Sequence, residues 1–83
     1  MITLTLLTRP NCALCDEFKH ELSGLLAQVN QPFEWHEQNV DDDPVLCRRF
    51  GLEIPVLLYQ GERIAGVPLD TAALQQLLAK LVA

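Results

Sequence analysis

The sequence predicts an α/β domain in which a four-stranded mixed sheet is flanked by helices, with the element order β-α-β-α-β-β-α. Strand-like hydrophobic segments alternate with segments of helical period, and turn residues separate them. A strand–helix–strand start implies two parallel strands joined by a right-handed crossover, to which a later hairpin adds an antiparallel pair. With 83 residues, of which 49% are hydrophobic, the chain has material for one core. We therefore expect a single domain over residues 1–83.

The first strand and the first helix are predicted from a change of hydrophobic period. Residues 2–7 are apolar on both faces, as in a strand buried on both sides of a sheet. Residues 8–11 then supply loop and turn residues. From about residue 13 to residue 29 apolar side chains recur at spacings of three and four. They are Cys15, Phe18, Leu22, Leu25, Leu26 and Val29. The helix is expected to end at Asn30-Gln31-Pro32, because proline disfavours helical geometry in the residue before it.

The middle of the chain predicts an edge strand and a short capped helix. Residues 33–40 begin with apolar–polar alternation, which is typical of a strand near the edge of a sheet. Asp43 is placed to cap a helix over residues 45–50, and Pro44 fits its first position. Gly51, followed by an apolar leucine, predicts that this helix ends in a Schellman motif.

The last third of the chain predicts a β-hairpin followed by a helix. Residues 55–59 and 63–65 read as strands around the turn Gln60-Gly61-Glu62. Asp70 is expected to cap the last helix, whose apolar residues again follow the helical period. These residues are Ala73, Leu74, Leu77, Leu78, Leu81 and Val82.

The charge balance and the cysteine count exclude several classes of function. Eleven acidic residues against six basic ones give a net charge of −5, which disfavours binding to nucleic acids and anionic membranes. No apolar run approaches the ~18 residues that a membrane helix needs, and the start lacks the features of a signal peptide. We therefore expect a cytoplasmic protein. Three cysteines in a reducing compartment do not form a structural disulfide framework.

Cys12 and Cys15 carry the clearest chemical signal, because they stand between the first strand and the first helix. Unpaired N–H groups and the positive end of the dipole at a helix N-terminus stabilise a thiolate. Cysteines in such motifs have pKa values of roughly 3.5–7.5 in place of about 8.5. Cys15 belongs to the apolar stripe of the helix, so we expect it to be more buried. These positions predict that Cys12 attacks a disulfide and that Cys15 resolves the mixed disulfide.

Three motifs together resemble the glutaredoxin-like branch of the thioredoxin superfamily over essentially the whole chain. They are Thr8-Arg9-Pro10-Asn11-Cys12-Ala13-Leu14-Cys15, Glu53-Ile54-Pro55 and Ile64-Ala65-Gly66. The resemblance implies a thioredoxin fold in which Pro55 is cis and faces the dithiol. It also implies that Ile54 offers its backbone to an extended substrate. The implied substrate-binding residues are Arg9, Ile54, Pro55 and Gly66.

The activity implied by the resemblance is thiol–disulfide exchange. The enzyme would reduce protein disulfides or glutathione mixed disulfides through a redox-active disulfide, with glutathione or a thioredoxin-type system as reductant. No bound cofactor and no metal are implied, glutathione is a candidate co-substrate, and nothing in the sequence demands more than a monomer. Three positions differ from the usual glutaredoxin pattern: Ala13-Leu14 replaces Pro-Tyr, Glu53 replaces Thr, and Ala65-Gly66-Val67-Pro68 replaces Gly-Gly and an acid.

Two other functions remain open from the residues alone. A non-catalytic thioredoxin-like module would hold an extended peptide beside Pro55 by strand-like pairing. A metal or iron–sulfur carrier would use the cysteine pair, although structural zinc usually has four ligands and His20, His36 and Cys47 form no second pair. Cys47 is expected to be a small buried hydrophobic residue of the second helix.

Overall fold

A four-stranded mixed sheet forms the centre of the computed structural model, which describes residues 2–29 and 33–81. The strands are β1 (Ile2–Thr8), β2 (Phe33–Asn39), β3 (Val56–Tyr59) and β4 (Glu62–Ala65), in the spatial order β2-β1-β3-β4. β1 pairs with β2 in parallel, whereas β1–β3 and β3–β4 are antiparallel. The α/β class and the predicted element order are confirmed.

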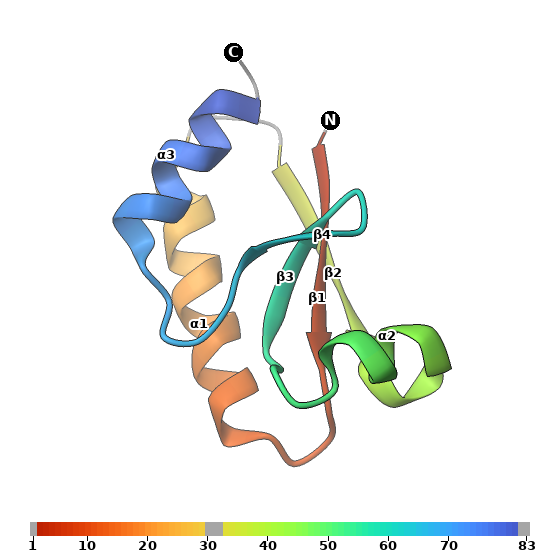
Figure 1. The fold of residues 1–83 in the computed structure, drawn as a ribbon. Coiled ribbons are helices and arrows are strands. Elements are labelled where there is room, and N and C mark those ends of the chain that lie inside the picture. The colour runs from red at the N-terminus through yellow and green to blue at the C-terminus, as the bar shows by residue number, and fades with distance from the viewer. Residues whose placement is uncertain (1, 30–32, 82–83) are drawn as a thin grey trace.

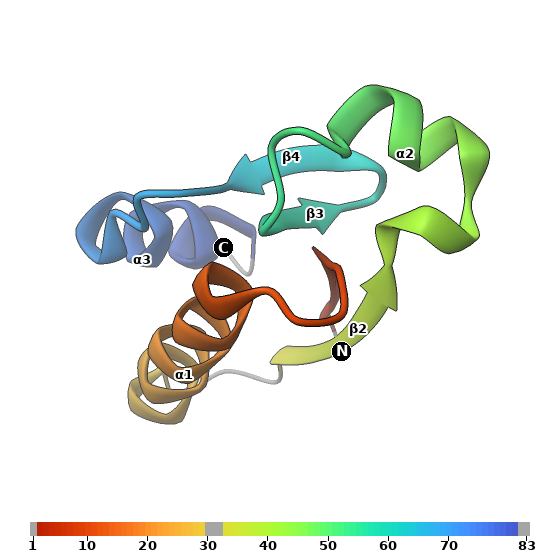
Figure 2. The ribbon, with the colours of Figure 1, turned by 90° about the horizontal axis from the view of Figure 1, so that it is seen from below.

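Helices cover both faces of the sheet (Figures 1 and 2). α1 (Ala13–Gln28) and α3 (Thr71–Leu81) lie on one face, and α2 (Pro44–Phe50) lies on the other after the 3₁₀ turn η1 (Val40–Asp42). The second half of β1 is buried on both faces, as its apolar sequence predicted, whereas Thr3 is exposed and Thr5 is half-buried. None of the helices in residues 2–29 and 33–81 is long and apolar enough to cross a membrane.

Two hydrophobic clusters fill the spaces between the sheet and its helices. The larger cluster joins β1 and β3 to α1 and α3, and its buried members are Leu4, Leu6, Phe18, Leu22, Leu25, Leu57, Leu74 and Leu78. The smaller cluster lies under η1 and α2, and its members are Leu7, Val40, Phe50, Val56 and Leu58. The unequal clusters show that α1 and α3 make the main core of the domain.

The helix starts follow the predicted capping residues. The Asp43 side chain accepts hydrogen bonds from the backbone N–H groups of Val45 and Leu46, and Pro44 occupies the first turn of α2. Asp70 accepts from the N–H of Ala73 at the start of α3. α1 ends at Gln28 with Val29 as its C-cap. The predicted stop at Asn30-Gln31-Pro32 and the apolar Val82 lie outside the described residues.

The Schellman motif predicted at Gly51 is wrong. Gly51 has φ −56° and ψ −28°, which is right-handed helical geometry and not the left-handed geometry of that motif. Leu52 is fully exposed, so the accompanying apolar contact is also absent. A Cβ atom on Gly51 would collide with the backbone carbonyl oxygen of Cys47, and this close approach explains the glycine.

The boundaries of the hairpin and of β2 differ from the predicted ones by one residue. The turn contains only Gln60 and Gly61, both with positive φ (51° and 82°), which is the type I′ geometry that matches strand twist. β3 begins after Pro55, and Glu62 belongs to β4. β2 ends at Asn39, whose side chain accepts from the N–H of Asp41 and starts η1.

Candidate functional site

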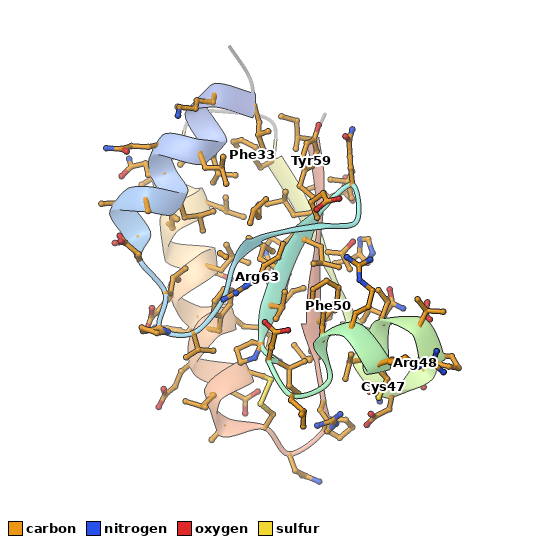
Figure 3. All side chains as sticks on the ribbon, in the orientation of Figure 1. Phe33, Cys47, Arg48, Phe50, Tyr59 and Arg63 are labelled. Atoms are coloured by element: carbon orange, nitrogen blue, oxygen red, sulfur yellow. A yellow bond between two sulfur atoms is a disulfide. The ribbon has the colours of Figure 1, made fainter. Side chains whose placement is uncertain are left out.

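Cys12 and Cys15 form a disulfide at the start of α1, with their Cα atoms 5.2 Å apart. Figure 3 draws this bond in yellow near the first turn of the helix. Cys12 is the N-cap residue, and its Sγ accepts a hydrogen bond from the backbone N–H of Cys15 at 3.1 Å. The sulfur therefore occupies the place where a helix offers its unpaired donors.

The two sulfur-bearing residues differ in their exposure. Only 1% of Cys15 is exposed, whereas Cys12 is partly exposed. Leu14, between them, is 53% exposed and points toward solvent. The burial contrast predicted from the sequence is present, and it leaves Cys12 as the sulfur that another molecule can reach.

Arg9, in the loop after β1, forms a bidentate ion pair with Asp41 of η1. Arg9 Nε donates to Asp41 Oδ2 and Arg9 Nη2 donates to Asp41 Oδ1, both at 2.9 Å. These hydrogen bonds hold the pKa of the Asp41 carboxyl below its usual value, and they raise the pKa of Arg9. The Arg9 guanidinium, an implied substrate-binding group, thus has a partner within the chain, and its substrate role stays a prediction.

Cys47, the third cysteine, lies beside this ion pair. Its Sγ is 3.6 Å from Asp41 Oδ1, and its side chain packs against the smaller hydrophobic cluster. Cys47 is only partly buried. The predicted hydrophobic packing therefore holds only for the side that contacts this cluster. Figure 3 labels it on α2.

Pro55 and Ile54 lie at the same end of the sheet as the dithiol loop. Val56 pairs with Leu7 across β1 and β3, which places Pro55 opposite the end of β1. The Ile54–Pro55 peptide bond is cis, and Pro55 is fully buried. A second cis peptide bond joins Val67 and Pro68. It was not predicted, because no local sequence pattern indicates it.

Gly66 follows β4 and lies next to a residue that sequence analysis also missed, Arg63. The Arg63 guanidinium occupies the space where a Cβ on Gly66 would stand, and Arg63 Nη1 lies 3.6 Å from Glu53 Oε1. Arg63 therefore links β4 to the segment that precedes Pro55 (Figure 3). Only its charge, opposite to that of Glu53, offered a signal in the sequence.

A cluster of polar and charged side chains lies beside the loop that precedes Cys12. The buried Thr8 hydroxyl donates to Glu37 Oε2 at 3.0 Å, and Lys19 Nζ lies 3.3–3.4 Å from the carboxylates of Asp16 and Glu37. These residues line a polar cavity of about 240 Å³ together with Arg9. Across residues 2–29 and 33–81, His, Cys, Asp and Glu form no group of three or more that could hold a metal ion.

Comparisons with known proteins give a matching family model and similar solved structures. The family model described as "Glutaredoxin-like domain (DUF836)" matches residues 3–79. The X-ray structure of the structural genomics target protein XcR50 from X. campestris is 31% identical, with a TM-score of 0.71 over 93% of this chain and 96% of that one. Its solution structure is 31% identical, with a TM-score of 0.70 over 96% and 95%.

A thioredoxin supports the same fold at greater distance. A mutant thioredoxin from Halobacterium salinarum NRC-1 is 23% identical, with a TM-score of 0.60 over 95% of this chain and 73% of that one. The predicted thioredoxin fold is confirmed by these likenesses. A comparison with curated proteins gives no match.

Proposed function

Because the chain belongs to the glutaredoxin-like domain family of the thioredoxin superfamily, we propose that it is a thiol–disulfide oxidoreductase with Cys12 and Cys15 as its redox pair. One observation carries this proposal: Cys12 caps α1 and accepts the N–H of Cys15, while Cys15 lies buried behind it. The structure shows the oxidised state of the pair. The proposed setting is the cytoplasm, where the chain acts as a monomer without a bound cofactor and a thiol reductant restores the dithiol.

In the reduced protein, the local backbone favours the thiolate of Cys12. The Cys15 N–H already points at the Cys12 sulfur, and the helix dipole adds a partial positive charge at the same place. Both interactions are stronger for an anionic sulfur than for a neutral thiol, which is a weak acceptor. We therefore expect the pKa of the Cys12 thiol in the reduced protein to lie below that of an ordinary cysteine.

The proposed exchange proceeds in two steps. The Cys12 thiolate attacks one sulfur of a substrate disulfide, that disulfide breaks, and the departing thiolate takes a proton from water. The mixed disulfide is resolved when Cys15 gives up its proton and attacks Cys12 Sγ, releasing the second substrate thiol. Two electrons pass from the dithiol to the substrate. An external thiol reductant, glutathione or a thioredoxin-type dithiol, then reduces the Cys12–Cys15 bond.

The segment before β3 is proposed to hold the substrate during these steps. Ile54 and Pro55 lie at the end of the sheet that carries the dithiol, and Ile54 is partly exposed. Its backbone groups are proposed to pair with an extended substrate as an added strand does. Gly66 lets Arg63 pack closely beside this segment. Arg9 binds a substrate carboxylate only if it exchanges Asp41 for it.

A redox titration with an alkylation readout tests the proposal. The wild type should form a reversible intramolecular disulfide with a potential between about −180 and −270 mV. Cys12→Ser should lose turnover, and Cys15→Ser should accumulate the mixed disulfide with substrate. Cys47→Ser is the matched control and should titrate like the wild type.

Two outcomes would contradict the proposal. A native protein whose Cys12 and Cys15 never form the bond, and which is alkylated only after denaturation, is not a dithiol enzyme. A Cys12→Ser variant that binds peptides as tightly as the wild type, from a wild type without turnover, would identify the non-catalytic binding module instead.

A further inference from the structure

A groove beside the dithiol lies between α1 and the segment that follows β4. Leu14 and Phe18 form its α1 side, and Val67, Pro68 and Leu69 form the opposite side. Leu14 stands between the two cysteines in the sequence, so the groove begins at the first turn of α1. Leu14 and Val67 are 53% and 41% exposed, so the groove presents accessible apolar surface on both of its sides.

The volume of the groove fits a side chain better than a small molecule. It encloses about 220 Å³, below the ~300–1,000 Å³ that is typical of small-molecule sites. One large aliphatic or aromatic side chain would fill it and would bury the exposed surfaces of Leu14 and Val67. Burial of such a side chain contributes favourable free energy of transfer from water.

Two carboxylates, Glu17 and Glu21, line the α1 side of the same groove. They are four residues apart and therefore lie on one face of the helix. The ion pairs found among the described residues join Arg9, Lys19 and Arg63 to other carboxylates, namely those of Asp41, Asp16, Glu37 and Glu53. The groove thus has an acidic wall without an ion-pair partner in the part of the chain that the structure describes.

The charges around the groove favour a basic ligand over an anionic one. In the sequence, the nearest cation to Cys12 is Arg9, the nearest to the groove residues of α1 is Lys19, and the nearest to Gly66 is Arg63. Each of them has a carboxylate within 4 Å. An anionic ligand such as glutathione would approach Glu17 and Glu21, whereas these three cations of the described residues are already paired with carboxylates. A lysine or arginine would instead complement both carboxylates.

From this geometry, and resting on the proposed oxidoreductase function, we infer the substrate class. The preferred substrate is a disulfide in a protein segment that carries a large apolar residue beside its cysteine and a basic residue next to that. The apolar side chain fills the groove between Leu14 and Val67, and the basic side chain pairs with Glu17 and Glu21. The exchange itself is the one described above, with the dithiol as electron donor.

Synthetic peptide disulfides test this assignment. Symmetrical disulfides of four cysteine peptides, which combine leucine or glycine with lysine or glutamate beside the cysteine, are mixed with the pre-reduced protein. Oxidised glutathione and the neutral bis(2-hydroxyethyl) disulfide complete the set. The rate of Cys12–Cys15 bond formation is followed by acid quench and alkylation. Each rate is divided by the rate of the same disulfide with free dithiothreitol, which removes differences in intrinsic reactivity.

The leucine–lysine peptide should react fastest, and the ratio of its rate to that of the leucine–glutamate peptide should fall with added salt. Glu17→Gln/Glu21→Gln should lower this ratio by about three- to tenfold, because exposed charge pairs are individually weak. Glu34→Gln/Glu62→Gln removes the same charge from β2 and β4 and should leave the ratio unchanged. Leu14→Ala should reduce the advantage of leucine over glycine.

The outcomes separate the two levels of the proposal. If the neutral disulfide oxidises the dithiol but all peptides react alike, or oxidised glutathione reacts fastest, the substrate assignment is wrong and the oxidoreductase function stands. An unchanged ratio in Glu17→Gln/Glu21→Gln also overturns the assignment. If no disulfide oxidises the pair, the oxidoreductase function itself fails.

Discussion

Cys12 occupies a position that polar residues with a side-chain oxygen usually fill. Ser, Thr, Asp and Asn are preferred N-caps because their oxygens accept the first helical N–H groups. A neutral sulfur is a weak acceptor, and a thiolate is a stronger one. The hydrogen bond from the Cys15 N–H to Cys12 Sγ therefore couples the first turn of α1 to the ionisation of the sulfur. In the proposed mechanism, the interaction that caps the helix at Cys12 also activates the nucleophile.

The pair of Arg9 and Asp41 gives a prediction for the pH dependence of stability. Arg9 holds the pKa of Asp41 below its usual value of 3.8 in the folded chain. A carboxyl with a lower pKa in the folded state stabilises that state above its unfolded pKa, and the contribution is lost as the pH falls through the folded pKa. Asp41→Asn should thus be less stable than the wild type near pH 7, and the difference should shrink below about pH 3.8.

Urea denaturation midpoints measured between pH 7 and pH 2.5 provide the comparison. Asp42→Asn is the matched control, because this neighbouring exposed carboxylate has no ion pair among the described residues. A difference for Asp41→Asn that is constant with pH, or equal for both variants, would show that the ion pair does not stabilise the fold.

The helix α1 contains a glycine at a position where an alanine side chain would meet no neighbouring atom. Gly24 is exposed, and a Cβ placed on it would meet no atom within 4 Å. Glycine in a helix interior is about 1 kcal/mol less favourable than alanine. Gly24→Ala should therefore raise the free energy of unfolding by about 0.5–1 kcal/mol, measured by chemical denaturation.

Gly51→Ala is the contrasting substitution for Gly24→Ala. Its Cβ would collide with the Cys47 carbonyl oxygen, so the end of α2 must shift and the free energy of unfolding should fall. If alanine stabilises the chain at both positions, or destabilises it at Gly24, the surroundings of these glycines are not those described above.

The elements that the sequence predicted well are those with a long hydrophobic period or a capping residue. α1 and α3 follow apolar stripes, and Asp43 and Asp70 make the capping hydrogen bonds expected of them. The predicted end of α2 at Gly51 is correct, but its predicted Schellman geometry was wrong because a glycine followed by leucine is compatible with two geometries. The Glu53 N–H bonds to Phe50 O as the chain turns toward Pro55, which leaves Leu52 in solvent.

In the whole molecule, the fold brings together segments of the candidate site that are far apart in the sequence. Their proximity cannot be predicted from local sequence patterns. The Cys12–Cys15 motif was readable because it stands at a strand–helix boundary. The groove opposite Leu14 was not, since its other wall follows β4 and depends on how α1 packs against that segment. The links from Arg9 to Asp41 and from Arg63 to Glu53 likewise need the sheet order before they can be inferred.

Because this arrangement depends on the larger core cluster, truncating that core should destabilise the whole domain. Leu78 of α3 is fully buried against β1, β3 and α1. Leu→Ala at such a site costs about 2–5 kcal/mol, out of about 4–12 kcal/mol expected for the 83 residues of this chain. Leu78→Ala should therefore lower the urea midpoint strongly and expose Cys15 of the reduced protein to alkylation at the same denaturant concentration.

Leu52→Ala makes the same change of side chain at a fully exposed position and should shift stability by less than about 0.5 kcal/mol. Cys15 lies in α1, so its protection from alkylation reports on that helix while far-UV circular dichroism reports on the sheet and all helices together. A single midpoint for both probes in Leu78→Ala means that the dithiol is held by the cooperative core. Alkylation of Cys15 well before the loss of circular dichroism would instead show that α1 detaches while the sheet persists. The protection of Cys15 would then depend on the local stability of α1 and not on the cooperative core.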